Sequence, residues 1–441
     1  MGIVRGRNDA PLSVVSSAKR RSRHRRNKRR HPSNLISPLM VDAPRIAFFI
    51  PSLSGGGAER VFVLLSQALS ERGWPVDLLL AQANGPYLDD IGGRVRLISF
   101  GTPGTLAAVP ALTRYLCAER PAVICSALPT AHIAASIAVN ARQLWGYVVR
   151  RDANRCTTDK TRHVITMHEL PSRRRKESTT IREWVVAWAL GIVSRQADHV
   201  VAVSHAVAAD VKIELGVAPN QLQAIYNPIE VDAILASRPP KPHSWLAADG
   251  LATIVSAGRF VRQKNMGALV DALVYTKTPC RLILLGEGPD RARVQEKARM
   301  LGLEDRVECP GFVRNPYDYI AHADVFALAS RWEAFGNVVV EALAAGTPVV
   351  CTDAEGGMTE ILRDPREAQP IGDIVPVGDE RALADALDRS LADRTDPEVR
   401  RRRARDFTVE ASAAQYAALF QKVQTTDSAY HSASDTESKW L

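Results

Sequence analysis

Short apolar runs alternate with stretches of helical periodicity from residue 45 onwards, and this pattern limits the possible folds more than any other feature. In the first half, five runs are predicted strands: Ile46–Ile50, Val76–Ala81, Val95–Phe100, Ala122–Ala127 and His199–Ser204. After a Pro-rich, aperiodic segment the pattern restarts, with predicted strands at 253–260, 281–289, 325–330, 348–353 and 374–378. Apolar strands separated by helices are typical of parallel sheets covered on both faces.

The pattern therefore predicts an α/β protein with two tandem doubly wound, Rossmann-like domains and a cleft between them. We expect a first Rossmann-like domain at residues 43–240 and a second at residues 241–405, joined by a linker at 237–250. A chain of 441 residues is too long for one ordinary core, which agrees with two domains. A last helix at 406–424 is expected to pack back over the first domain, and residues 425–441 to be loose.

The net charge of +9 arises from the N-terminal tail. Residues 1–40 contain eleven Lys and Arg and one Asp, a net +10, and the remaining 46 basic and 47 acidic residues leave −1. We expect residues 1–42 to be disordered, because they lack apolar periodicity. Met1 and Met40 are both candidate start sites. An anionic membrane surface is one candidate partner of this tail, and nucleic acid is another.

Cysteine usage and hydropathy predict a cytoplasmic protein. Six cysteines are scattered without a CxxC pair, which favours neither zinc nor disulfides. No run of about 18 apolar residues predicts a membrane span. The basic cluster RRRK at 173–176 precedes a helix with Trp184 and Trp188, a combination that can dock on the inner face of a membrane. A core helix behind a solvated loop is the alternative.

Two carboxylates stand in an unusual position in the segment RWEAFGNVVVEALAAGTPVV, residues 331–350. Glu341 lies within an apolar run, and Glu333 lies eight residues before it. Burying an unpaired charge is costly, so Glu341 needs a partner or a function. Gly336 and Gly346 predict the start and the end of a helix. The free backbone N–H groups at such a start bind anions.

Basic and glycine-rich loops follow two predicted strands. In SAGRFVRQKN, Arg259 follows a strand and Lys264 lies five residues later. Two cations at a strand's carboxyl end suit a diphosphate, because Arg can donate two parallel hydrogen bonds to a phosphate and Lys supplies a compact positive charge. In PSLSGGGAERV, residues 51–61, three glycines let the backbone approach a ligand closely.

These motifs, together with GEGPDR, VAVSHAV and YNPIE, resemble the retaining nucleotide-sugar glycosyltransferases of the GT-B fold, the group 1 glycosyl transferases with two glutamates separated by seven residues. The resemblance covers roughly residues 43–423 and is most specific over 253–362. It implies transfer of a sugar from a nucleoside-diphosphate sugar, with UDP the expected carrier. The implied acceptor is a glycan or a lipid-linked glycan, in cell-envelope polysaccharide or lipopolysaccharide biosynthesis.

The resemblance also implies residue roles. Glu333 would contact the donor sugar and Glu341 the ribose, while Arg259 and Lys264 would hold the diphosphate. The remaining donor-binding residues implied are Gly56, Gly57, Phe335, Gly336 and Asn337. The chain has no Asp-x-Asp pair, so neither a metal ion nor another cofactor is expected.

Two stretches compete for the polar active-site motif of the first domain. HVITMHEL offers His168 as a catalytic residue and Glu169 on the acceptor side. YVVRRDAN offers Asp152 and Asn154 instead. We favour His168, because it ends an apolar run abruptly.

Two other functions are considered. A nucleotide-sugar epimerase or a phosphorylase can be built on the same fold. A nucleic-acid-binding protein that uses the Arg-rich tail is disfavoured by the near-neutral remainder of the chain. The sequence determines neither the base and sugar of the donor, nor the acceptor, nor the oligomeric state.

Overall fold

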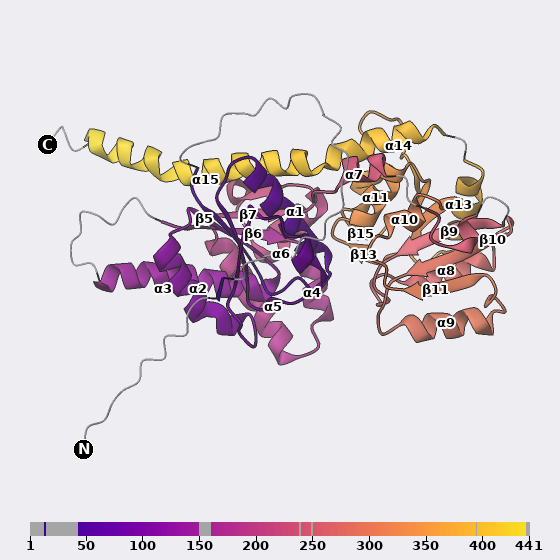
Figure 1. Ribbon diagram of the computed structural model, residues 1–441, viewed down its shortest axis with the longest axis horizontal. Coiled ribbons are helices and arrows are strands. Elements are labelled where there is room, and N and C mark those ends of the chain that lie inside the picture. Colours follow the sequence, from indigo (N-terminus) through magenta and orange to yellow (C-terminus); the bar gives the residue numbers. More distant parts are fainter. Residues whose placement is uncertain are drawn as a thin grey trace, which may run out of the picture. The chain divides into compact units, whose positions relative to one another are not determined.

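The computed structural model of the chain describes residues 13–14, 43–149, 160–237, 240–247, 250–393 and 395–437. The chain folds as two compact units. The first contains Met1–Thr166, Thr179–Val200 and Tyr416–Leu441, and the second contains Met167–Ser178 and Val201–Gln415. Figure 1 shows the two principal sheets with their covering helices.

The first sheet has the strand order β1-β4-β3-β2-β5-β6-β7-β8. Strands β2 to β6 pair in parallel with their neighbours, whereas β1 pairs antiparallel with β4. The strands are β1 (Ser13–Val14), β2 (Ile46–Ile50), β3 (Val76–Leu80), β4 (Arg96–Ser99), β5 (Val123–Ala127), β6 (Arg162–Met167), β7 (His199–Ala202) and β8 (Leu222–Ala224). Strand β1 lies in the tail that was expected to be disordered, so that expectation is wrong for these residues. The sequence there, Ser13-Val14-Val15, is rich in valine, and β-branched residues favour strands.

The helices between these strands follow the predicted alternation. They are α1 (Gly57–Glu71), α2 (Val109–Glu119), α3 (Pro129–Val149), α4 (Pro171–Glu177), α5 (Ile181–Gln196), α6 (His205–Leu215) and α7 (Val231–Ala236). No helix in the described part of the chain combines the length and the apolar character that crossing a bilayer requires.

The second sheet has six strands in the order β11-β10-β9-β12-β14-β16, all paired in parallel. They are β9 (Ala252–Ala257), β10 (Cys280–Leu285), β11 (Val307–Gly311), β12 (Val325–Leu328), β14 (Val349–Thr352) and β16 (Asp373–Val375). A separate ribbon pairs β13 (Trp332–Glu333) with β15 (Glu355–Gly356). The helices are α8 (Met266–Leu273), α9 (Arg291–Met300), α10 (Tyr317–Ile320), α11 (Asn337–Ala345), α12 (Met358–Leu362), α13 (Glu380–Leu391) and α14 (Pro397–Ala404). The predicted fold class, parallel α/β, is confirmed.

Each sheet has a point where the direction of chain growth reverses. From β9 the chain adds β10 and β11 on one side, and then β12, β14 and β16 on the other. The first sheet is built in the same way around β2 and β5. Ligands of open parallel sheets bind at such switch points, beyond the carboxyl ends of the strands.

The last helix, α15, spans Val409–Glu437 and is longer than predicted (Figure 1). In the first unit, the buried Phe420 packs edge-on against Phe48 of β2, with ring centroids 6.2 Å apart. The helix continues through residues 425–437, where a loose tail was expected. That stretch contains no Gly or Pro to stop a helix.

A buried polar cluster lies inside the first unit. The Ser126 hydroxyl is 2.9 Å from both His132 Nδ1 and His163 Nε2, and the His163 backbone N–H donates to Asp198 Oδ2 over 2.8 Å. Burial lowers the pKa of His163 to about 4. The imidazole is therefore neutral in the folded protein near pH 7, which suits its place in the core.

Acidification should destabilise the protein through His163. Below pH 6.5 the His163 imidazole takes up a proton in the unfolded chain, whereas in the folded chain it stays neutral down to about pH 4. The free energy of unfolding should therefore fall by about 1.4 kcal/mol per pH unit in this window. Urea unfolding at pH 7 and pH 5 measures the change. His163→Gln should reduce the loss by about 2 kcal/mol, while His205→Gln, at an exposed histidine, should keep the wild-type loss. Equal losses in both variants would exclude His163 as the cause.

Candidate functional site

Two of the predicted site residues, Lys264 and Glu333, meet at the switch point of the second sheet. Strand β9 leads into the loop that carries Lys264, and β12 leads towards Glu333. The Lys264 ammonium forms an ion pair with the Glu333 carboxylate, and the two side chains are only 15% and 13% exposed. The Ser330 hydroxyl donates to the same carboxylate over 3.3 Å. The structure thus brings together a cation and an acid that lie 69 residues apart in the sequence.

Arg259 is the second predicted cation of this loop. Its side chain is exposed, and it forms no ion pair with the residues that the structure describes. The backbone next to it is hydrogen-bonded to the neighbouring loop, since Phe260 N donates to Glu287 O over 2.9 Å. A Cβ atom at Gly286 would lie 2.0 Å from Gly258 O, so this approach of two loops requires glycine. The GEGPDR motif therefore supports the loop that presents Arg259.

Helix α11 begins at Asn337 and ends at Ala345, which confirms the predicted helix. Gly336 precedes it with φ +101°, a left-handed conformation that favours glycine, and no side chain caps the helix start. The first backbone N–H groups are therefore available to an anion. The side chain of Phe335 is buried, so only its backbone can face a ligand.

Glu341 lies one turn inside α11 and is 3% exposed. The carboxylate is therefore buried, as its place within an apolar run indicates. Its role as a ribose ligand stays a prediction.

A second layer of residues supports the turn before α11. The ring of Tyr226 stacks on Phe335, with centroids 5.5 Å apart. Asn227 Nδ2 donates to Asn337 Oδ1 over 2.9 Å, and the Ser204 hydroxyl donates to the Ala334 carbonyl over 2.8 Å. Sequence reasoning assigned no role to these residues, although VAVSHAV and YNPIE contain them.

Glu360 anchors the segment that carries Ser204 and Tyr226. Its carboxylate accepts hydrogen bonds from the His205 and Ala206 N–H groups at the start of α6, over 3.0 and 2.7 Å, and from the Tyr226 hydroxyl over 3.1 Å. The Glu360 carboxylate thus lies at the N-terminus of α6, where the helix dipole favours a negative charge. The sequence alone indicated no role for Glu360.

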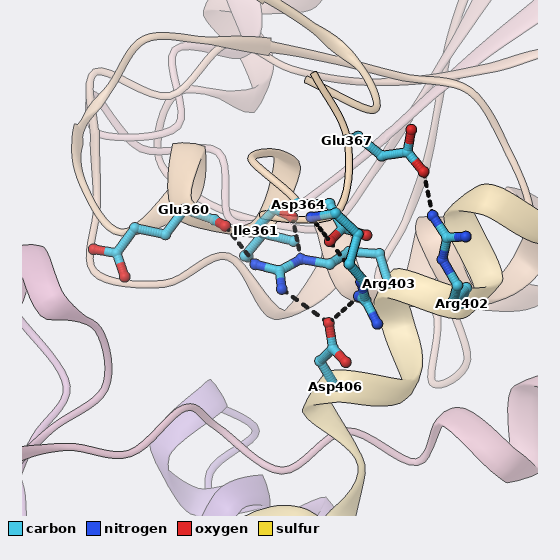
Figure 2. A network of polar contacts seen from close by, with 8 residues as sticks. Glu360, Ile361, Asp364, Glu367, Arg402, Arg403 and Asp406 are labelled. Carbon is cyan, nitrogen blue, oxygen red and sulfur yellow. Dashed lines mark hydrogen bonds and ion pairs between the residues drawn. The ribbon is translucent and has the colours of Figure 1, made fainter. Parts of the chain in front are cut away.

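Arg403 of α14 holds the chain around Glu360 from the other side. Figure 2 shows its guanidinium between Asp406 and the backbone of α12. It donates to the carbonyls of Glu360 and Ile361 over 2.7 and 2.9 Å and pairs with Asp406 over 2.9 Å. Arg403 is 7% exposed, so its guanidinium forms its hydrogen bonds almost entirely with the protein and not with water.

His168 follows β6, in the segment of the second unit that precedes α4. Desolvation lowers the pKa of His168 to about 3, so the imidazole is neutral at pH 7. The Glu169 carboxylate is bound by Arg174, whose Nη2 donates over 2.8 Å. The competing Asp152 and Asn154 lie outside the described residues.

The basic cluster 173–176 is largely engaged within the second unit. Arg173 pairs with Glu355 of β15 and lies 5.3 Å from the ring of Trp332. Arg175 pairs with Glu214 over 3.3 Å, and Arg174 binds Glu169 as above. These contacts place the segment beside the β13–β15 ribbon that also carries Glu333.

Gly56 and Gly57 lie in the first unit, at the switch point beyond β2. Gly56 is the N-cap residue of α1, and Gly57 is its first residue. Both stand where a backbone can bind an anion, and their roles in donor binding remain predictions.

A cavity of about 560 Å³ lies at the amino ends of β14 and β16, whereas the site described above lies at the carboxyl ends of the strands of this sheet. Its arginines are neutralised, since Arg389 pairs with Asp373 and Arg400 with Asp393. We assign it no part in donor binding, because ligands of such sheets bind at the carboxyl edge.

Two family models match the chain. "Glycosyl transferases group 1" matches residues 237–407, and "Glycosyltransferase Family 4" matches residues 55–233. The chain belongs to the group 1 glycosyltransferases. The site at the carboxyl edge of the second sheet lies within the first of these matches, which also contains Arg259, Lys264, Glu333 and Glu341.

Relatives of this glycosyltransferase include named enzymes. One is the N-acetylgalactosamine-N,N'-diacetylbacillosaminyl-diphospho-undecaprenol 4-alpha-N-acetylgalactosaminyltransferase of Campylobacter jejuni, 27% identical over 359 residues, which are 79% of this chain and 90% of that protein. Another is the lipopolysaccharide core biosynthesis glycosyltransferase LpsE of Rhizobium meliloti, 36% identical over 140 residues, 32% of this chain and 39% of LpsE.

Solved structures confirm the GT-B fold. HepE of Anabaena, solved in complex with UDP, matches with a TM-score of 0.67 and 21% identity, over 86% of this chain and 100% of HepE. Sucrose-phosphate synthase of Thermosynechococcus elongatus matches with a TM-score of 0.67 and 23% identity, over 86% of this chain and 99% of that enzyme. At these identities the likeness shows the fold alone.

Proposed function

We propose that this glycosyltransferase moves a sugar from a nucleoside-diphosphate sugar, with UDP as the carrier, to a glycan or lipid-linked acceptor, with retention of the anomeric configuration. The observation that carries the proposal is the Lys264–Glu333 pair at the switch point, between the Arg259 loop and the start of α11. The names of the Campylobacter jejuni and Rhizobium meliloti relatives support an acceptor in lipopolysaccharide or lipid-linked glycan biosynthesis. HepE, solved with UDP, supports the carrier.

The diphosphate is assigned to the cations of this site. Arg259 is exposed, so it can grip a phosphate with its fork of N–H donors. Lys264 is held in place by Glu333 and supplies a point charge, and the N–H groups at the start of α11 supply a dipole. Preorganised positive charge of this kind stabilises the negative charge that develops on the leaving diphosphate. These groups suit catalysis without a metal ion or other cofactor.

Glu333 is assigned to the donor sugar. As the bond between the anomeric carbon and the phosphate oxygen breaks, its electron pair passes to the diphosphate and the sugar ring becomes positive. The acceptor hydroxyl then bonds to the anomeric carbon from the same face, and its proton passes to the departing phosphate oxygen. This route requires no protein base, so the neutral His168 can act as a hydrogen-bonding group near the sugar. Glu169 and the undescribed Asn154 stay candidates for the acceptor side.

We place the enzyme in the cytoplasm, at the inner face of the membrane, where nucleotide sugars and a lipid-linked acceptor meet. The basic tail and the helix with Trp184 and Trp188 support this placement.

A thermal-shift panel of nucleotide sugars tests the donor assignment. At 100 times its Kd, the cognate donor should stabilise the protein by about 2.7 kcal/mol, a shift of roughly 5–10 °C, with UDP sugars ahead of other carriers. Glu341→Gln keeps the size of the side chain but removes the charge for the ribose, and it should abolish most of the shift. Glu380→Gln, at a partly exposed glutamate in the first turn of α13, is the control that should keep it. Retention of the full shift by Glu341→Gln would contradict the ribose role.

A further inference from the structure

Helix α5 is apolar on two opposite faces. Leu190, Val193 and the small Ser194 form one face, which is buried inside the first unit, where α5 neighbours α3. At 100° per residue, Ile181, Trp184, Val185 and Trp188 fall on the opposite face, at the spacing i, i+3, i+4, i+7. Their side chains are 86%, 53%, 56% and 68% exposed. A helix that is apolar all round is normally buried, so the exposed face needs an occupant.

The exposed first turns of α5 are stabilised by hydrogen bonds at the start of the helix. The start of α5 has a capping box, in which the Thr180 hydroxyl accepts from Glu183 N and the Glu183 carboxylate accepts from Thr180 N. Glu183 is the only acid of α5, and its helical position lies about 150° from the centre of the apolar face. Arg182 is exposed beside that face. The apolar face is thus preformed, and its flank is basic.

The geometry points to a lipid surface, and we propose that Ile181, Trp184, Val185 and Trp188 insert into the headgroup region of an anionic phospholipid membrane. Tryptophan is suited to that region, because its ring is apolar while its N–H can remain in contact with water. The N-terminal tail, with a net charge of +10 over residues 1–40, complements an anionic surface.

A protein partner fits the face less well. Four side chains on two helical turns are short of the ~800 Å² that a stable interface buries on each partner. Adsorption to a bilayer needs no complementary surface and scales with the apolar area and the attraction between charges. The inference is independent of the proposed transfer reaction, because membrane binding is measured without donor or acceptor.

Vesicle sedimentation tests the proposal with the full chain. Vesicles of phosphatidylcholine with 30% phosphatidylglycerol are used at 0.1 and 0.5 M NaCl. The higher salt screens the attraction between the basic tail and the anionic headgroups, so binding at 0.5 M NaCl reports the contribution of the apolar side chains. The wild type should sediment at both salt concentrations. Trp184→Ser with Trp188→Ser should reduce the partition coefficient at 0.5 M NaCl at least tenfold, with an unchanged thermal midpoint. Ile213→Ser, at an exposed apolar residue of α6, is the matched control and should bind as the wild type does.

Two outcomes would overturn the proposal. One is a double variant that binds within twofold of the wild type at both salt concentrations. The other is a wild-type dimer, seen by light scattering, that the double variant converts to a monomer, which would assign the face to a second copy of the chain.

Discussion

Replacing Lys264 with Met should lower kcat by about 10²–10³-fold, the largest effect that we expect from a single substitution. Methionine keeps the aliphatic stem but removes the ammonium that pairs with Glu333. Losing one preorganised group that stabilises developing charge typically costs about 3–4 kcal/mol of transition-state stabilisation. The rate is measured as release of UDP from the UDP sugar identified by the thermal-shift panel, with water as the acceptor, so that breaking of the sugar–phosphate bond is observed directly.

Arg262→Met is the matched control, since it removes a positive charge from the same loop. Arg262 is 79% exposed and lies 3.9 Å from Glu177, so its loss should change kcat less than twofold. Equal effects of the two substitutions would mean that the general positive charge of the loop matters and the Lys264–Glu333 pair does not.

Replacing Arg403 with Ala should lower the stability of the second unit by about 3–5 kcal/mol. The substitution leaves the Glu360 and Ile361 carbonyls without their donor and removes one of the two arginines that bind Asp406 (Figure 2); the other is Arg366. A buried carbonyl that loses its donor costs about 1–3 kcal/mol, so the two carbonyls account for most of this loss. The thermal midpoint, followed by circular dichroism, should fall by roughly 6–15 °C.

Arg405→Ala serves as the control for Arg403. Arg405 is 48% exposed, pairs with Glu398 over 2.6 Å and should contribute at most about 1 kcal/mol. A loss of less than 1 kcal/mol in Arg403→Ala would show that water replaces the guanidinium, and that the contacts around Glu360 do not depend on it.

Most of the fold could be predicted from local patterns. Alternating apolar runs and helical periodicity indicated the two parallel sheets, although β6, β8 and β11 were not among the predicted strands. These strands contain polar residues or are short, so their periodicity is weak. The glycines at 336 and 346 predicted the bounds of α11, because left-handed backbone is a local property.

Part of the candidate site could be predicted in the same way. Arg259 and Lys264 follow one strand, and Glu333 and Gly336 follow another. The residues that hold the site were missed, because their contacts join distant segments. Ser204 and Ala334 are 130 residues apart in the sequence, and His205 and Glu360 are 155 apart. No local periodicity encodes such pairs.

By itself, the sequence determined where strands, helices and glycine turns occur, because these depend on the residues within a few positions of one another. Only the tertiary structure decided which side chains meet, as with Lys264 and Glu333, and which apolar faces are covered. Helix α5 illustrates the difference. Its composition fits a core helix and a surface helix equally, and only packing buries Leu190 while leaving Trp188 exposed. Burial depends on what other segments cover, and that follows from the whole arrangement of the chain.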